Sequence, residues 1–371
     1  MWWSVVALAG LATGVAFKRV GVQALILERS ETLRTTGAAL GLLPNAWLAL
    51  DALGISHKLT SRYAPSLSFN PHIIIWGFVT NVAAGAVQEI FYSEAEGKEP
   101  RTVHRKALLE ALAQELPDDS IRFSSKLNAI EKQELGGDSI IVVLIGCDGV
   151  HSVVANWLAL SAPVYSGRSA ARGLAIFPQG HGLRQEVNQF VDAGKRADPE
   201  LIQKQVIEKY AENFPSQYLE VVRHSDLSTL TWAPLMLRHP WNVVFGNLSK
   251  GNITVAGDAM HPMTPDLAQG GCSALEDAVV LGRHIGNSFI KNGGLLVPED
   301  VATALDAYVK DRRWRAAMLI TRSYLSGWVQ QDAILYGLVF TKVFNAVHYD
   351  CGTLPSISAS GELQFSSKKS D

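Results

Sequence analysis

The segment that most constrains the fold runs from Asn252 to Gly271, where a short apolar run ends in Gly-Asp and a proline-containing loop follows. The apolar run 252–256 predicts a strand, and Gln-Gly-Gly at 269–271 predicts the start of a helix. The first turn of a helix offers free backbone N–H groups and a positive dipole end to an anionic or electron-rich ligand. The residues that we expect around such a ligand are Gly257, Asp258, His261, Pro262, Pro265, Gln269, Gly270 and Gly271.

The N-terminal region carries part of a dinucleotide-binding fingerprint. This pattern requires a strand, G-x-G-x-x-G at the start of a helix, and an acidic residue about 20 positions further on. Gly10 can serve as the third glycine and Glu28, 18 residues later, as the carboxylate for a ribose. The first two glycine places are Val5 and Ala7, and only Met1–Ser4 remain for the strand. Taken alone, the pattern is more commonly a helix with one glycine at a close packing contact.

A third cluster follows the apolar run 139–145, which is typical of a strand buried on both faces. The run ends in Gly146-Cys147-Asp148-Gly149. In an open parallel sheet, ligands bind at the carboxyl ends of the strands, so Asp148 and Gly149 are candidates for binding a nucleotide. The alternative is an ordinary turn, because Asp-Gly is a common turn dipeptide.

Composition excludes several classes of protein. The 371 residues are 47% apolar and 18% charged, which is unlike the composition of a disordered chain. The net charge of −2 gives no basic footprint, so we expect no nucleic-acid partner. The three cysteines, Cys147, Cys272 and Cys351, are far apart and show no metal-ligand spacing, so we expect no metal site and no disulfide framework.

The first 17 residues are uncharged, and Lys18-Arg19 follow them. A signal peptide carries its positive charge before the apolar stretch, and a membrane span needs about 20 apolar residues. We therefore expect a buried strand that runs into a glycine-containing helix, in a protein that is intracellular and not secreted. Membrane association through this stretch is the less favoured alternative.

The order of the predicted elements indicates a mixed α/β fold, α+β overall, in which one nucleotide-binding domain is interrupted by a β-rich domain. Strands are expected at 22–27, 73–76, 87–92, 121–123, 127–130, 139–145, 186–191, 227–237, 241–245 and 252–256, and helices at 10–20, 44–53, 104–116, 198–214 and within 274–336. The charged run Lys310–Arg315 is expected on the solvated face of a late helix. The expected domains are a cofactor domain over 1–165 (with part of the substrate sheet at about 65–95), a shortened substrate domain over 166–246, a return over 247–335 and a tail over 336–371.

These three clusters, in this order, resemble the FAD-dependent aromatic-ring monooxygenases of the para-hydroxybenzoate hydroxylase type. The segments GCDGVHSVVANWLAL, GDAMHPMTPDLAQGGCSALEDAVVL and RTTGAALGLLPNAWLALDALGI are similar to the plant salicylate-hydroxylase-like and zeaxanthin-epoxidase-like branch. The resemblance covers about Val5 to Gln331. It implies a glutathione-reductase-like FAD-binding Rossmann domain with an inserted β-rich substrate domain and a helical C-terminus.

The resemblance also implies roles for individual residues. Asp258 would bind the ribitol or pyrophosphate part of FAD, Asp148-Gly149 would serve FAD and the nicotinamide cofactor, and Glu28 would bind the adenosine ribose. Arg105 would reach toward the flavin, and the loop from Pro262 to Gly271 would lie against the isoalloxazine. NAD(P)H would reduce FAD, and O₂ would then form a flavin C4a-hydroperoxide that attacks a small aromatic or electron-rich substrate.

Three departures from the family pattern bear on activity. The first strand and two fingerprint glycines are missing or replaced, and segments near 134–140 and 195–198 are shorter than the family pattern implies. Without bare glycine backbone, the pyrophosphate would meet the Val5 and Ala7 side chains, so we expect weak FAD binding. The alternative to an active monooxygenase is therefore an impaired paralogue or truncated gene product that retains the fold. A membrane-associated enzyme of isoprenoid or pigment chemistry is a third hypothesis.

Overall fold

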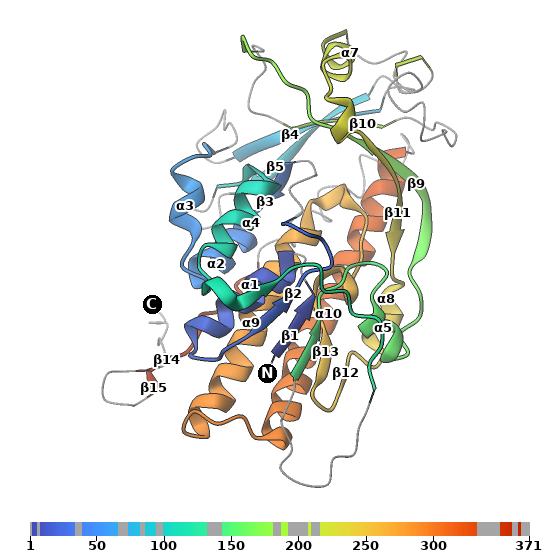
Figure 1. Cartoon of the computed structure of the whole chain (residues 1–371). Coiled ribbons are helices and arrows are strands. Elements are labelled where there is room, and N and C mark those ends of the chain that lie inside the picture. The colour runs from blue at the N-terminus through green and yellow to red at the C-terminus, as the bar shows by residue number, and fades with distance from the viewer. Residues whose placement is uncertain are drawn as a thin grey trace.

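The computed structural model (Figure 1) describes a mixed helix and strand fold. It describes residues 2–5, 8–33, 39–65, 73–81, 86–93, 99–131, 143–180, 187–191, 207–208, 216–331, 349–357 and 363–364. The two shortened segments at 134–140 and 195–198 lie outside the described residues, as does most of the helix that we predict over 198–214.

A six-stranded sheet forms the centre of the molecule, in the order β12-β13-β8-β1-β2-β7. Its strands are β1 (Trp2–Val5), β2 (Leu25–Leu27), β7 (Ile121–Arg122), β8 (Val143–Gly146), β12 (Ser249–Lys250) and β13 (Ile253–Val255). Only β12 pairs antiparallel to its neighbour in this sheet. The parallel strands therefore direct their carboxyl ends to one edge, where loops can meet around a ligand.

The expectation that the first strand is missing is wrong. β1 lies in the interior of the sheet, and its residue Trp3 pairs with Leu25 on one side and Leu144 on the other. Four residues are enough because the neighbouring strands are themselves only three and four residues long. The chain then enters α1 (Leu8–Arg19), so the predicted strand and buried glycine-containing helix are confirmed.

Two long helices cover the sheet together with α1. These are α9 (Gln269–Lys291) and α10 (Pro298–Gln331). α1 and α9 cross closely, since a Cβ atom added to Gly282 would lie 2.8 Å from the Cβ of Ala16. Such a contact leaves no room for a larger side chain at position 282 and lets α9 pack closely against the first helix. No described helix is both long and apolar enough to cross a membrane.

A second group of strands lies at the far end of the molecule from the N-terminus (Figure 1). It contains the sheet β10-β4-β5 and the antiparallel pair β11-β9. Their bounds are β4 (Ile73–Asn81), β5 (Ala86–Ser93), β9 (Val164–Arg172), β10 (Val187–Val191) and β11 (Thr231–Leu237). The remaining strands are β3 (Ala39–Leu42), which pairs with β6 (Arg101–His104), and β14 (Ser356–Ile357), which pairs with β15 (Leu363–Gln364).

Short helices connect these strands. They are α2 (Pro44–Ala52), α3 (Ser56–Thr60), α4 (Arg105–Ala113), α5 (Val153–Trp157), α7 (Ser216–Arg223) and α8 (Pro240–Val244), with 3-10 turns η1 (Asp118–Ser120), η4 (Leu227–Thr229), η5 (Gly257–Ala259) and η6 (Pro265–Leu267). Gly21 and Gly54 follow α1 and α2 with φ of +80° and +72°, the left-handed conformation that ends helices.

Two strand predictions are wrong. The run 241–245 forms the helix α8, because Pro240 occupies its first turn after an extended His239, and Val243 and Val244 are the side chains that it buries. The run 127–130 forms no regular strand in the described structure, where β7 ends at Arg122 and closes the sheet at this edge.

Candidate cofactor site

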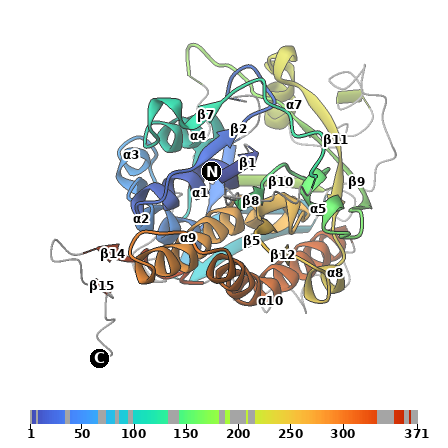
Figure 2. The ribbon, with the colours of Figure 1, turned by 60° about the horizontal axis from the view of Figure 1, so that its bottom comes forward.

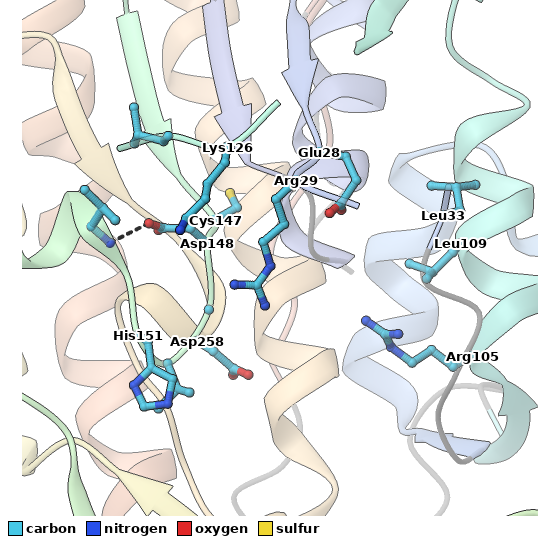
Figure 3. Close-up of a pocket in the computed structure, with 14 residues that line it drawn as sticks. Glu28, Arg29, Leu33, Arg105, Leu109, Lys126, Cys147, Asp148, His151 and Asp258 are labelled. Carbon is cyan, nitrogen blue, oxygen red and sulfur yellow. Dashed lines mark hydrogen bonds between the residues drawn. The ribbon is translucent and has the colours of Figure 1, made fainter. Parts of the chain in front are cut away.

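A cavity of about 560 Å³ lies at the carboxyl ends of the central parallel strands (Figure 3). Glu28 follows β2, Asp148 follows β8, and Asp258 follows β13, and all three line the cavity. The other lining residues are Arg29, Leu33, Arg105, Leu109, Lys126, Leu127, Cys147, Gly149, Val150, His151 and Val153. The cavity thus combines a carboxylate from each of three strand ends with several cationic side chains.

Glu28 is held at the end of β2 with its carboxylate turned toward the cavity (Figure 3). The residue is only 2% exposed, and Oε1 accepts a hydrogen bond from the backbone N–H of Ser30 at 2.8 Å. Arg29, the next residue, is exposed and extends its guanidinium into the same cavity. This pair places an acceptor and a positive charge side by side.

Asp148 shapes the loop after β8. Its Oδ2 accepts the backbone N–H of Val153 at 2.6 Å, and its Oδ1 accepts the hydroxyl of Ser152. These bonds cap the start of α5 and fix the turn that contains Gly149. Gly149 has a φ of +83°, in the left-handed region, where a side chain would add strain.

Asp258 also lines the cavity, and its carboxylate is directed into it (Figure 3). Although the side chain is exposed to this space, the surrounding protein limits its hydration and raises its pKa above the ordinary value. The positive charges of His261 and Arg105 oppose that shift without cancelling it. Arg105 faces Asp258 from the start of α4.

The other predicted site residues lie around the cavity rather than on its wall. Gly10 is buried within α1, and a Cβ atom on Gly257 would lie 2.9 Å from the Cβ of Ala9. Gln269 is fully buried, and its Oε1 accepts a hydrogen bond from Asn45 at 3.0 Å. The remaining predicted residues lie in or beside the 3-10 turns η5 and η6 and at the start of α9: His261, Pro262, Pro265, Gly270 and Gly271.

The start of α9 is open toward Asp258. Its N-cap, Ala268, is left-handed at a φ of +52° and provides no side-chain hydrogen bond to the first turn. A Cβ atom on Gly270 would lie 4.0 Å from Oδ1 of Asp258, so the two residues are neighbours. The free N–H groups of this 23-residue helix therefore lie close to the cavity wall.

A buried ionic network lies directly behind this wall. Asp277 accepts hydrogen bonds at Oδ2 from His261 Nε2 at 2.6 Å and from the backbone N–H of Gly257 at 2.8 Å. Arg312 donates through Nε to Asp277 at 2.7 Å, and its Nη1 lies 2.7 Å from Glu276. Arg315 completes the network with a 3.0 Å pair to Glu276. The network therefore connects the Gly257-Asp258 turn to α9 and α10.

The expectation that Lys310–Arg315 is a solvated face is wrong for two of its arginines. Arg312 is fully buried and Arg315 is 7% exposed. Burial of these charges is possible because the adjacent carboxylates of α9 neutralise both of them. The run belongs to a helix that exposes Lys310 and Asp311 to water and directs Arg312 and Arg315 into the protein.

The charges in this network shift one another's pKa values. Burial raises the pKa of Asp277, but the charges of His261 and Arg312 outweigh burial and lower it to about 2. Burial lowers the pKa of His261, but Asp277 outweighs that effect and holds the pKa above its ordinary value. His261 therefore keeps its proton to a higher pH in the folded protein than a free imidazole does.

The contact between His261 and Asp277 predicts how the free energy of unfolding depends on pH. Because the pKa of His261 is raised in the folded state, its pairing with Asp277 contributes fully to the free energy of unfolding below about pH 6.5, the pKa in the unfolded state. This contribution is lost as the pH rises through the folded-state pKa. The free energy of unfolding should fall across this window in the wild type and should be flatter in His261→Gln. Urea unfolding at a series of pH values tests this, with His151→Gln, at an exposed histidine outside the network, as the control. Equal slopes in wild type and His261→Gln would contradict the prediction.

Sequence reasoning missed several residues of the site. Arg29 and Lys126 line the cavity but belong to no fingerprint, and His151 lies in the segment GCDGVHSVVANWLAL but was given no role. The Glu276–Asp277 pair was a signal that could have been used, since two adjacent acids within the apolar run SALEDAVVL require buried partners. Their partners on α10 are 35 to 39 residues away in sequence and are found only from the structure.

Comparisons with known proteins identify the family. A family model described as "FAD binding domain" matches residues 161–323. "Monooxygenase 2" of Arabidopsis thaliana is 36% identical over 399 residues, which covers 94% of this chain and 96% of that protein. The chain belongs to the FAD-dependent monooxygenase family. "Monooxygenase 1" of Arabidopsis thaliana is 33% identical to this monooxygenase over an aligned region that covers 94% of this chain and 97% of that protein.

The structural comparison agrees with this assignment at the level of the fold. The crystal structure of Klebsiella pneumoniae HpxO complexed with FAD and uric acid has a TM-score of 0.71 at 21% identity, and covers 92% of this monooxygenase and 92% of that chain. The predicted family, with its plant relatives, is therefore confirmed, and so are its class as an oxidoreductase and the family's cofactors, FAD and NAD(P)H.

The residues around the cavity fit FAD. A ribose requires hydrogen-bond acceptors for its hydroxyls, and the carboxylate of Glu28 is such an acceptor. A pyrophosphate requires positive charge and free N–H groups, which Arg29, Arg105 and the start of α9 can provide. The hydrogen-bonding and charged groups, and the row of neighbouring strand ends along which they lie, therefore suit a dinucleotide.

Proposed function

We propose that the protein is an FAD-dependent monooxygenase that uses NAD(P)H and O₂ to hydroxylate a small aromatic or otherwise electron-rich substrate. The observation that carries the proposal is the meeting of Glu28, Asp148 and Asp258 around one cavity at the carboxyl ends of parallel strands. Relatives named for urate, 3-amino-4-hydroxybenzoate and zeaxanthin chemistry support an electron-rich substrate.

Each wall of the cavity has a proposed part in holding the cofactor. Glu28 binds the adenosine ribose, and Arg29 and Arg105 balance the phosphate charge. Asp258 and the start of α9 hold the ribitol and pyrophosphate region, and the turn at Gly149 lets the backbone approach the ligand. The loop with His261, Pro262 and Pro265, together with Gly10 of α1 and with Gln269, Gly270 and Gly271 at the start of α9, completes the proposed site.

When bound, FAD supplies the electron transfer from NAD(P)H and the activation of O₂, for which amino-acid side chains are unsuited. The chain's own residues bind and orient the partners and exclude water. Behind the Gly257-Asp258 turn, Asp277 contacts Nε2 of His261 at 2.6 Å and accepts the backbone N–H of Gly257 at 2.8 Å. A fixed turn at this point would present Asp258 to the cofactor in one geometry.

The proposed division of the chain follows from this site. The cofactor domain comprises 1–165 and the return segment 247–335, and the substrate domain comprises 166–246 with the strands at about 65–95. The sheet β10-β4-β5 and the pair β11-β9 support a separate β-rich part. The segment 336–371 is the proposed tail.

Purified full-length protein tests the proposed function directly. An active enzyme should show flavin absorption and should oxidise NADH or NADPH with consumption of O₂ when an aromatic substrate is added. Electron-rich phenols and purines are suitable first probes, and a substrate-dependent hydroxylated product would complete the assignment. Protein that stays colourless after reconstitution with FAD would instead support the alternative, an impaired paralogue, which the side chains of Val5 and Ala7 favour.

A ranking of two variants tests the proposed roles within the cavity. Asp258→Ala should weaken FAD binding more than Glu28→Ala, because Asp258 follows an intact motif whereas two glycines of the Glu28 fingerprint are replaced. Loss of a charged hydrogen bond costs about 1.5–3 kcal/mol, or about 10–150-fold in affinity. Fluorescence titration of the apoproteins with FAD measures this, with the exposed Asp119→Ala as a control that binds like wild type. Equal losses for Asp258→Ala and Glu28→Ala would count against the ranking.

A further inference from the structure

The second half of α10 exposes apolar side chains where a solvated helix would expose charges. Between positions 314 and 328, all of which the structure describes, the exposed residues are Trp314, Met318, Thr321, Tyr324, Leu325 and Trp328. Trp314 is 63% exposed and Trp328 is 54% exposed. The first half of the same helix exposes Asp306, Lys310 and Asp311 instead. The same helix therefore changes from a water-facing surface to an apolar one.

The spacing of these residues places them in one stripe. Positions 314, 318, 321, 325 and 328 alternate steps of four and three, which is the spacing of a helix–helix seam. Residues at these steps lie along a single face of an α-helix. A helix lying alongside α10 could contact all five.

The neighbouring helix α8 widens the stripe into a groove. α8 lies beside α10 at the outer edge of the molecule (Figure 2) and exposes Trp241 and Phe245, the latter to 82%. The groove has a volume of about 390 Å³ and is lined by Pro240, Trp241, Val244, Phe245, Trp314, Ala317, Met318, Thr321 and Arg322. We call the stripe and this groove together the α8–α10 face.

The size of the α8–α10 face matches one side of a protein dimer. Seven of the eleven large hydrophobic side chains that are exposed among the described residues lie on this face or, in the case of Tyr324, directly beside its stripe. Since a large aromatic side chain presents about 150–250 Å², these seven expose on the order of 700 Å² together. Monomers rarely expose apolar patches above about 600 Å², and a stable interface takes about 800 Å² from each partner.

The order of residues along the stripe is self-complementary. Trp314 and Trp328 are each seven positions from Thr321, so an antiparallel copy of the helix centred on Thr321 would place Trp314 against Trp328 of the partner subunit. The hydroxyl of Thr321 already donates to the carbonyl of Ala317 at 2.9 Å, so its methyl group can meet its own copy. We propose that the α8–α10 face joins two copies of this chain in an antiparallel, two-fold dimer.

The charge pattern favours a second copy over a lipid surface. A helix that binds anionic membranes carries Lys and Arg along the border of its apolar face. Here Arg322 is the only basic residue among those that line the groove, and the exposed residues before the stripe include Asp306 and Asp311 beside Lys310. The face therefore suits a neutral apolar partner.

Sedimentation of the full-length protein tests the dimer. The wild type should sediment as a dimer at micromolar concentration, and Trp314→Glu and Trp328→Glu should each raise the dimer Kd at least about 30-fold. Leu295→Glu, at a residue 68% exposed but off the α8–α10 face, should leave Kd within about twofold. Circular dichroism and thermal unfolding would establish that the variants are folded. A wild type that is monomeric throughout, or a dimer indifferent to both tryptophan changes, would overturn the proposal.

Disulfide crosslinking tests the antiparallel geometry. Thr321→Cys should form a covalent dimer under mild oxidation, because its two copies meet at the two-fold axis. Thr303→Cys is the matched control: it is an exposed threonine on α10 whose hydroxyl also bonds the preceding turn, but it lies about 27 Å along the helix from the axis. The three native cysteines are buried and free, so they should contribute little background. Equal crosslinking of both variants, or monomers that bind vesicles of neutral phospholipid, would contradict the dimer.

Discussion

Replacing Arg312 by methionine should lower the free energy of unfolding by about 3–5 kcal/mol, the cost of leaving buried charge without its partner. Arg312 is fully buried and neutralises both Glu276 and Asp277. Methionine fills similar space but carries no charge, so Arg315 and His261 would be the basic partners left to the two carboxylates among the described residues. Urea unfolding with matched slopes measures the loss.

Two further variants separate the charge effect from simple damage to the helix. Lys310→Met, on the exposed side of the same helix, should change the free energy of unfolding by less than about 0.5 kcal/mol. Adding Asp277→Asn to Arg312→Met should recover part of the loss, because it removes the carboxylate that has lost its partner. An Arg312→Met variant within about 1 kcal/mol of wild type would show that the network contributes little.

The network also connects stability to the candidate cofactor site. Asp277 holds the backbone N–H of Gly257, the residue before Asp258, so a displaced Asp277 would loosen the wall that faces the cavity.

The positions of Glu28, Asp148 and Asp258 could be predicted from the sequence, because each follows a short apolar run and strand ends are visible in a local pattern. The ion pairs could not be predicted in the same way, because they depend on how α9 and α10 pack after a turn.

The error at α8 has a related cause. In WNVVF the large side chains Trp241, Val243 and Phe245 alternate, which is the pattern of a strand. The protein instead buries the adjacent pair Val243 and Val244, and Arg313 of α10 donates to the carbonyl of Val244 at 2.7 Å. Tertiary contacts with α10 and the preceding proline therefore outweigh the local alternation, and they leave Trp241 and Phe245 exposed on the α8–α10 face.

The short first strand was misjudged for a different reason. The length of a strand that a sheet requires depends on its neighbours, and β2 and β8 are as short as β1. The four-residue strand is therefore sufficient for the sheet. The replaced glycines are a separate matter, because they concern the ligand: β1 ends at Val5 and α1 begins at Leu8, and Ala7 lies outside the described residues.

Restoring the two glycines should raise FAD affinity on the order of 100-fold. In the fingerprint, the first glycine makes the tight turn and the second lets the backbone N–H groups approach the pyrophosphate. Each charge-assisted hydrogen bond so gained contributes about 1.5–3 kcal/mol, and two of them give at least this change in affinity. Val5→Gly combined with Ala7→Gly should therefore increase the flavin-to-protein ratio of the purified protein and lower the Kd measured by titration of the apoprotein.

The same variant should separate the effect on the ligand from the effect on the sheet. Glycine weakens a strand, so without FAD the double variant should unfold at a lower temperature than wild type. With saturating FAD the order should reverse, since a ligand that binds only the folded state stabilises it in proportion to the logarithm of its concentration over Kd. Ala12→Gly, at a fully buried position in α1, should lose stability with no gain in flavin. If the unchanged chain is already fully loaded with FAD, the side chains of Val5 and Ala7 do not obstruct the pyrophosphate, and the fingerprint glycines are dispensable in this protein.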